Sequence, residues 1–210
     1  MRYRLAIRFA IEGDLRFISH HDSLRLFERA LARAETPVRF SEGFNPRPRM
    51  RLALPRPVGV ASLDELLVVE LSQDSEAQAI FECLRRQMPE GLALLGVERL
   101  SDHDERRPNE ATYELPIDPQ MVEPLTRRAA DLLAMDHLWV TRKTPRSIRA
   151  KSVDIRAFLT RMLVADDRLT WTQTVSQDGT VRIGELLEAL GLTSEEHLHR
   201  VTRRSVAYQR

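Results

Sequence analysis

The sequence predicts an α+β protein made of two lobes. Apolar and polar residues alternate strictly at the start of the chain, which is typical of a half-buried strand. Periodicity then gives the order strand, helix, strand, strand, helix, strand up to residue 100, and a similar order begins again after residue 110. This order is typical of the split βαβ, or ferredoxin-like, α/β sandwich, in which two helices cover one face of a four-stranded antiparallel sheet.

We therefore expect three parts. Residues 1–100 form a ferredoxin-like lobe, the polar stretch 101–110 is a linker, and residues 111–210 form a second, degraded ferredoxin-like lobe.

The first lobe begins with a strand in which apolar residues from Tyr3 to Ile11 alternate with arginines and alanines. A helix is predicted over 20–35, because apolar residues recur at helical spacing until Pro37 ends it. The remaining predicted elements are strands over 50–54, 63–71 and 92–100 and an amphipathic helix over 75–88. We expect Cys83, on this second helix, to be buried as an apolar filler.

The second lobe is predicted to begin with a strand, a helix and a strand over 111–117, 120–135 and 137–141. Residues 157–164 fit a strand or a helix, Asp178-Gly179 predicts a hairpin turn, and Gly191 ends a short helix over 185–190. The last predicted element, over 197–208, is a strand or a tail, and a strand would place His197 and His199 on one face. Trp139 and Trp171 are expected in the core.

Composition excludes several classes of protein. Apolar residues make up 42% of the chain, which is enough for a core, and charged residues make up 30%. No apolar run approaches the ~18 residues of a membrane-spanning helix, and the charged N-terminal segment does not fit a signal peptide, so we expect a cytoplasmic protein without membrane contact. The single cysteine can neither close an internal disulfide nor hold zinc or an iron–sulfur cluster alone. We expect no metal and no cofactor in this chain.

The net charge is only +1, but the basic residues are unusual. There are 32 of them against 31 acids, and all except Lys143 and Lys151 are arginines. A GC-rich genome would favour arginine codons, and recognition of phosphates or bases would favour the arginine side chain. Residues 36–60 contain five arginines and one acid, and residues 142–156 contain six basic residues and one acid. Such acid-poor segments could form a local cationic surface on a neutral protein.

The first motif is Ser19-His20-His21-Asp22 at the start of the predicted helix. Ser19 and Asp22 have the spacing of a capping box. Serine, histidine and aspartate could also form a nucleophilic relay, but capping is the simpler function, and we expect His20 to be a structural hydrogen-bonding residue.

The second motif is the loop over 41–48. Gly43 permits a positive φ, and Pro46 and Pro48 make the loop rigid. Phe44 either plugs the core or forms an exposed platform on which a base can stack, while Arg47 and Arg49 are separated from acids.

The two motifs belong to the runs FISHHDSLR over 17–25, FERALARA over 27–34, Pro37-Val38 and SEGFNPRP over 41–48. Together they resemble the radical-SAM-linked family of unknown function, strongly over residues 1–72. KSVDIR over 151–156 resembles a second, weaker signature of that family. His21 stands where the family usually has an aliphatic residue, and Arg47 where it often has histidine or another basic residue. The resemblance implies a protein that is fused to, or encoded beside, a radical S-adenosylmethionine (SAM) enzyme.

We therefore expect a non-catalytic accessory protein of a separate radical SAM enzyme, which binds or presents an RNA substrate, either tRNA or rRNA. The alternative is a protein-interaction module that docks on that enzyme and completes it without touching nucleic acid. A hydrolase or transferase that uses His20 and Asp22 is the least favoured reading.

The expected binding residues, for RNA or the partner enzyme, are Arg16, His20, Arg25, Arg29, Arg33, Phe44, Asn45, Arg47, Arg49, Arg149, Lys151 and Arg156, and the expected structural residues are Ser19, Asp22, Gly43, Pro46 and Pro48. The RNA hypothesis requires arginines from distant segments to converge on one uncompensated surface.

Overall fold

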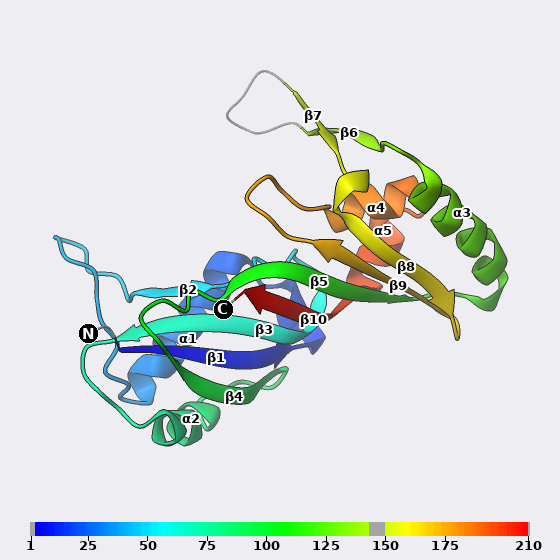
Figure 1. The fold of residues 1–210 in the computed structure, drawn as a ribbon. Helices are drawn as coiled ribbons and strands as arrows, with labels where there is room; N and C mark the ends of the chain where they lie inside the picture. Colours follow the sequence, from blue (N-terminus) through cyan, green and yellow to red (C-terminus); the bar gives the residue numbers. More distant parts are fainter. Residues whose placement is uncertain (1–2, 143–149, 210) are drawn as a thin grey trace. The chain divides into compact units, whose positions relative to one another are not determined.

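The computed structural model describes residues 3–142 and 150–209 (Figure 1). It confirms an α+β protein that contains a large sheet and several helices. The chain divides into two compact units, Met1–Pro108 with Tyr208–Arg210 and Asn109–Ala207. The boundary at residue 108 falls within the stretch predicted as a linker, although β5 already begins at Arg107.

The first unit contains four strands in the order β4 (Leu92–Leu100), β1 (Tyr3–Ile11), β3 (Ala61–Leu71) and β2 (Met50–Leu52). Each neighbouring pair is antiparallel. The register places Arg4 of β1 opposite Glu70 of β3, and Arg51 of β2 opposite Val68 of β3. Side chains alternate along a strand, so the register decides which of them share a face.

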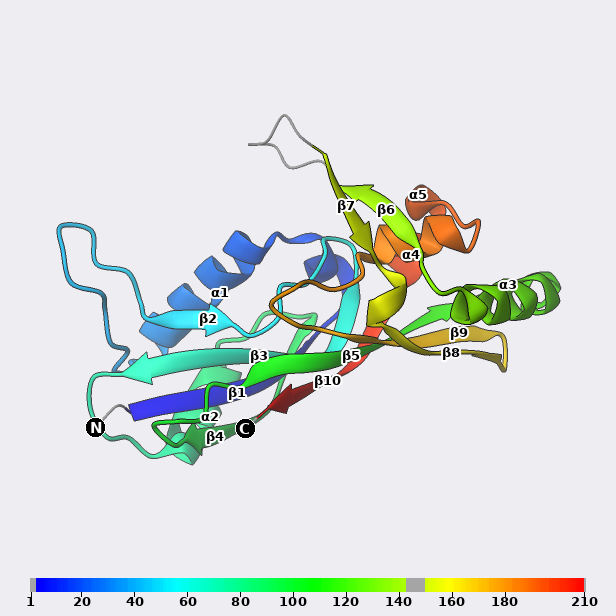
Figure 2. The ribbon, with the colours of Figure 1, turned by 45° about the horizontal axis from the view of Figure 1, so that its top comes forward.

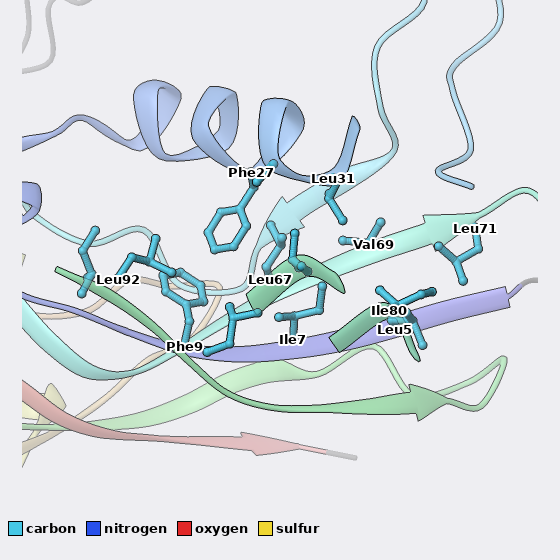
Figure 3. Packing of buried hydrophobic residues seen from close by; sticks show 14 residues of the cluster. Leu5, Ile7, Phe9, Phe27, Leu31, Leu67, Val69, Leu71, Ile80 and Leu92 are labelled. Carbon is cyan, nitrogen blue, oxygen red and sulfur yellow. The ribbon is translucent and has the colours of Figure 1, made fainter. Parts of the chain in front are cut away.

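One face of this sheet packs against α1 (His20–Arg33) and α2 (Ala77–Arg85). Figure 3 shows alternate residues of β1 meeting the apolar side of α1. The rings of Phe9 and Phe27 pack edge to face with their centroids 4.8 Å apart. The intervening residues of β1, including Arg4 and Arg8, therefore lie on the opposite face. The 3₁₀ helix η1 (Gly13–Phe17) joins β1 to α1.

The second unit has its strands in the order β10 (Thr202–Gln209), β5 (Arg107–Pro116), β9 (Arg168–Thr174) and β8 (Leu159–Ala165). A separate pair of strands consists of β6 (Trp139–Arg142) and β7 (Lys151–Asp154). Trp171 is fully buried and stacks on Tyr113, with a centroid distance of 5.3 Å.

The helices of this unit are α3 (Val122–Ala134), α4 (Ile183–Ala189) and α5 (Ser194–His197), with 3₁₀ segments η2 (Pro119–Met121), η3 (Arg156–Phe158) and η4 (Leu198–Arg200). None of the helices in the described ranges has the length and apolar composition needed to cross a membrane.

Several local predictions are wrong. Cys83 is exposed, because the buried side of α2 is formed by Ile80 and Leu84. Trp139 is 61% exposed, because it lies on the small β6–β7 pair, away from the unit's core.

Two further predictions for the second unit also fail. His197 and His199 lie in α5 and η4, not on a strand, because β10 begins only at Thr202. The turn at Asp178-Gly179 is present, but the chain after it enters α4 and forms no second strand.

Candidate functional site

Ser19 caps α1. Its Oγ accepts a hydrogen bond from the backbone N–H of Asp22 at 3.1 Å and donates one to Asp22 Oδ2 at 2.6 Å. This hydrogen bond from Ser19, together with the nearby Arg25, lowers the pKa of the Asp22 carboxyl. The hydroxyl is thus engaged in the cap, which orphan amides at a helix start require.

His20 lines a cavity of about 10 Å³, which is enough for roughly one water molecule. Glu65 and Arg56 also line it. The Nδ1 atom of His20 is buried, and no atom of the described chain forms a hydrogen bond with it. Desolvation lowers the pKa of His20, and the neighbouring His21 lowers it further, which favours the neutral imidazole.

The 41–48 loop is closed by hydrogen bonds across its base. The Ser41 N–H donates to the Arg47 carbonyl at 2.8 Å, and the Arg47 N–H donates to Ser41 Oγ at 2.9 Å. Gly43, with φ of 120°, has a conformation that L side chains rarely adopt. The loop extends outward from the first unit between α1 and β2 (Figure 2).

The aromatic ring of this loop, and that of Phe40 just before it, are exposed to solvent. Phe44 is completely exposed and Phe40 is 51% exposed. Of the two alternatives for Phe44, the structure therefore supports the exposed platform. Asn45, Pro46 and Arg47 are exposed beside it, while Pro48 is half-buried.

The α1 arginines are partly engaged. Arg25 pairs with Asp22 at 3.4 Å, and Arg33 donates to the side chain and the carbonyl of Gln87 at 3.0 and 3.1 Å. Arg16, in η1, lies over the ring of Phe17 at 5.3 Å. Among the described residues, Arg29 forms no ion pair with a carboxylate.

Three other arginines meet at a recess on the opposite face of the sheet. We call it the arginine pocket. Its volume is about 290 Å³, and it is lined by Arg4, Arg49, Met50, Arg51, Val68 and Glu70. The antiparallel register explains the set, because Arg4 faces Glu70 and Arg51 faces Val68 across neighbouring strands. Residue 49 precedes β2 and shares the side of Arg51.

The arginine pocket is electrostatically unbalanced. Desolvation lowers the pKa of the Arg51 guanidinium, Glu105 opposes this effect, and Arg4 and Arg107 lower the pKa further. Glu105 is itself ion-paired with Arg107, which lowers the pKa of the Glu105 carboxyl through a hydrogen bond. Arg49, which was expected to be separated from acids, lies 3.6 Å from Glu70, and Arg39 lies 3.9 Å from the same carboxylate. Five guanidinium groups thus lie near two carboxylates, those of Glu70 and Glu105.

Pairing distinguishes Arg4 from Arg8, its neighbour on the same face of β1. Arg8 forms two hydrogen bonds with Asp64, at 2.8 and 3.1 Å. Arg4 instead donates to the carbonyl of Ser101 and makes no ion pair with a carboxylate in the described chain. The positive charge of Arg4 is therefore available to a ligand.

The second basic segment behaves differently. Arg156 donates to the carbonyls of Leu159 at 2.9 Å and Leu133 at 2.6 Å, so both of its terminal nitrogens are engaged within the unit, although its buried Nε has no hydrogen-bond partner in the described chain. Lys151 is exposed on β7, and the predicted binding residue Arg149 lies outside the described residues.

The structure thus brings together only part of the predicted surface. In the first unit, the arginines of α1 lie on the helical side, whereas Arg49 lies on the opposite side of the sheet. Sequence reasoning missed Arg4 and Arg51. Both residues lie at polar positions of segments in which polar and apolar residues alternate, and this alternation could have indicated that they share a sheet face. Only the strand register shows that they lie close together.

No group of three or more His, Cys, Asp or Glu in the described ranges is placed to hold a metal ion. A family model described as "uncharacterized protein conserved in bacteria (DUF2344)" matches residues 4–184. The chain belongs to this family. The DUF2344 match includes both motifs and the arginine pocket.

No curated protein matches the chain. A solved structure, that of an unknown protein from Galdieria sulphuraria, is 16% identical, and the match covers 100% of each chain with a TM-score of 0.30. A likeness of that degree supports no argument about fold or function.

Proposed function

We propose that this DUF2344 protein is a non-catalytic accessory protein that binds RNA, either tRNA or rRNA, for a separate radical SAM enzyme. The arginine pocket is the observation that carries the proposal. Arginine's planar guanidinium suits phosphate oxygens, and phosphate contacts supply most of the sequence-independent affinity for nucleic acid. Arg4 and Arg51 enlarge the predicted set around Arg49, whereas Arg156 contributes less than we expected.

The 41–48 loop supplies the second contact. An exposed ring with an adjacent arginine is suited to unstacked bases, which single-stranded RNA presents in loops and bulges. Phe44 and Arg47 have this arrangement.

The link to a radical SAM enzyme rests on the resemblance of the two motifs to the radical-SAM-linked family. The same proposal includes ferredoxin-like lobes. The strand orders β4-β1-β3-β2 and β10-β5-β9-β8 support it. When the strands of each unit are numbered along the chain, with the β6–β7 pair treated as an insertion, both sheets have the spatial order 4-1-3-2.

The test is binding of the purified full chain to tRNA and to rRNA fragments in a filter or mobility-shift assay. We expect binding at low ionic strength that weakens steeply with salt. Arg51→Ala should reduce the affinity about tenfold, within the range for one charge-assisted contact. Arg85→Ala is the matched control, because Arg85 is an exposed arginine of the same unit that is paired with Glu82 at 3.2 Å. Absence of salt-sensitive binding, or equal losses in the two variants, would refute the proposal.

The exposed pair Phe40 and Phe44 also favours a second candidate, docking on the enzyme itself. A pull-down with the neighbouring gene product separates the two functions. If Phe44→Ala abolishes capture of the enzyme and leaves RNA binding intact, the loop is a protein contact.

A further inference from the structure

Two residues that line the arginine pocket each contain a buried polar atom that forms no hydrogen bond. These atoms are Nε of Arg4, a donor, and Oε2 of Glu70, an acceptor, and neither has a hydrogen-bond partner in the described chain. Buried polar groups are nearly always paired, so each such atom requires an explanation. These two residues lie directly opposite each other on β1 and β3, yet no ion pair joins them in the described structure.

Two arginines lie close to the Glu70 carboxylate without forming a hydrogen bond to its Oε2. Oε2 lies 3.6 Å from a guanidinium nitrogen of Arg49 and 3.9 Å from one of Arg39. Both distances exceed a normal hydrogen bond. The oxygen therefore retains the capacity to accept a hydrogen bond from a ligand.

The pocket thus requires a ligand with two properties. It must carry negative charge for Arg4, Arg49 and Arg51, and it must offer a hydrogen-bond donor to Glu70. A volume of about 290 Å³ is at the lower end for small-ligand sites, which run from roughly 300 to 1,000 Å³. Val68 supplies an apolar wall.

We propose that the arginine pocket binds one ribonucleotide unit of an RNA chain, with the phosphate held by Arg4, Arg49 and Arg51 and the ribose 2′-hydroxyl donating to Glu70. Glu70 is then the residue that selects RNA over DNA, because the 2′-hydroxyl is the group that distinguishes them. A bare phosphodiester is a poorer fit, since it has no proton to offer the carboxylate. This inference rests on the proposed RNA-binding function and names the part of RNA that is recognised.

The experiment measures the affinity of the full chain for three single strands of one uracil-containing sequence: RNA, deoxyuridine-containing DNA and 2′-O-methyl RNA. The wild type should bind RNA roughly tenfold more tightly than DNA, as expected for one hydrogen bond to a charged group. The 2′-O-methyl strand should bind like DNA, because its ether oxygen cannot donate.

Glu70→Ala should bind RNA and DNA equally, with the DNA affinity unchanged or raised because a negative charge is removed. Glu70→Gln keeps an acceptor oxygen, so it should retain part of the preference, and it serves if the alanine variant fails to fold. Glu82→Ala is the matched control, since Glu82 is on the outer side of α2 and the charge change is the same. The control should alter both affinities alike and keep their ratio.

Equal wild-type affinity for RNA and DNA would overturn this inference and leave the proposed function standing. Full retention of the RNA preference in Glu70→Ala would overturn the role of Glu70. Tight binding of the 2′-O-methyl strand would overturn the donor role of the hydroxyl. Absence of any nucleic-acid binding would refute the inference and the proposed function together.

Discussion

The three arginines of the arginine pocket, in the first unit, differ from three engaged arginines of the second unit. In the second unit, Arg142 is held by both carboxylate oxygens of Glu185, at 2.7 and 2.6 Å, and by the carbonyl of Thr180. Arg156 is held by two carbonyls, and Arg203 is buried and donates to the hydroxyl of Tyr113. In the first unit, Arg4, Arg49 and Arg51 surround an open pocket.

The two sets of arginines differ in how many hydrogen-bond acceptors the folded chain places around each guanidinium group. The five donors of an arginine can all be engaged by fixed carbonyls and carboxylates, and the side chain is then part of the fold. Where the fold supplies fewer acceptors than donors, the remaining donors are available to a ligand. An arginine-rich segment is therefore a candidate site only where the folded chain leaves donors unused.

The strongest test of this comparison is Arg142→Ala. The substitution would remove the close ion-pair partner of Glu185, whose side chain is only 15% exposed, and leave it only the more distant Arg182 at 4.0 Å. Removing one partner of a largely buried pair is strongly destabilising, and we expect a loss of about 2–4 kcal/mol in the free energy of unfolding. Urea unfolding followed by tryptophan fluorescence measures it, because both tryptophans, Trp139 and Trp171, are in this unit.

Arg127→Ala is the control for this measurement, because Arg127 is an exposed arginine of α3 paired with Glu123. It should change stability little. If Arg142→Ala leaves stability unchanged but weakens RNA binding, the two units do not differ as described.

The next test compares the exposed aromatic residues of the two units. Phe44→Ala should weaken binding of single-stranded RNA about tenfold, since stacking of one base contributes roughly 1–3 kcal/mol. Trp139→Ala, in the second unit, removes a ring that is 61% exposed but not in an arginine-bearing loop, and it should have no such effect. Equal losses in the two variants would place the second unit at the interface as well. Phe44→Tyr, which keeps the stacking surface, should bind like the wild type.

Helix capping gives a smaller effect. Ser19→Ala removes the side chain that caps α1 and should cost about 1 kcal/mol of stability. Hydrogen exchange of the first-turn amides of α1 would report the loss. Ser19→Asp keeps an acceptor for the Asp22 amide and should recover part of it, although it brings a second negative charge close to Asp22. If Ser19→Ala is as stable as the wild type, the cap does not stabilise α1.

Much of the local structure was predictable from the sequence. Hydrophobic periodicity, together with the proline and glycine residues that end helices and strands, identified β1, α1, β3 and α2 to within a few residues. The cap at Ser19 was predictable for the same reason, because it depends on residues three positions apart.

Features that depend on distant residues were not predictable. The arginine pocket joins residues from β1, β2 and β3, and no local pattern gives the register that brings Arg4 and Arg51 together. The internal role of Arg156 depends on the carbonyl of Leu133, a residue far from it in sequence. The predicted burial of Trp139 is wrong for a similar reason, because the hydrophobicity of a strand does not show that its strand pair lies outside the core.

The smallest predicted effect concerns pH and the cavity beside His20. Its pKa is below the ordinary value of about 6.5 in the folded protein, so below that pH the unfolded chain binds more protons than the folded one. The stability contributed by neutral His20 is therefore complete above about pH 6.5 and is lost as the pH falls from there through the folded pKa. His20→Gln should lack this component, and its unfolding free energy should fall less between about pH 7.5 and pH 5. Hydrogen exchange of α1 amides at the two pH values measures it, with His103→Gln, an exposed histidine of the same unit, as the control. A pH dependence as steep in His20→Gln as in the wild type would show that groups other than His20 determine it.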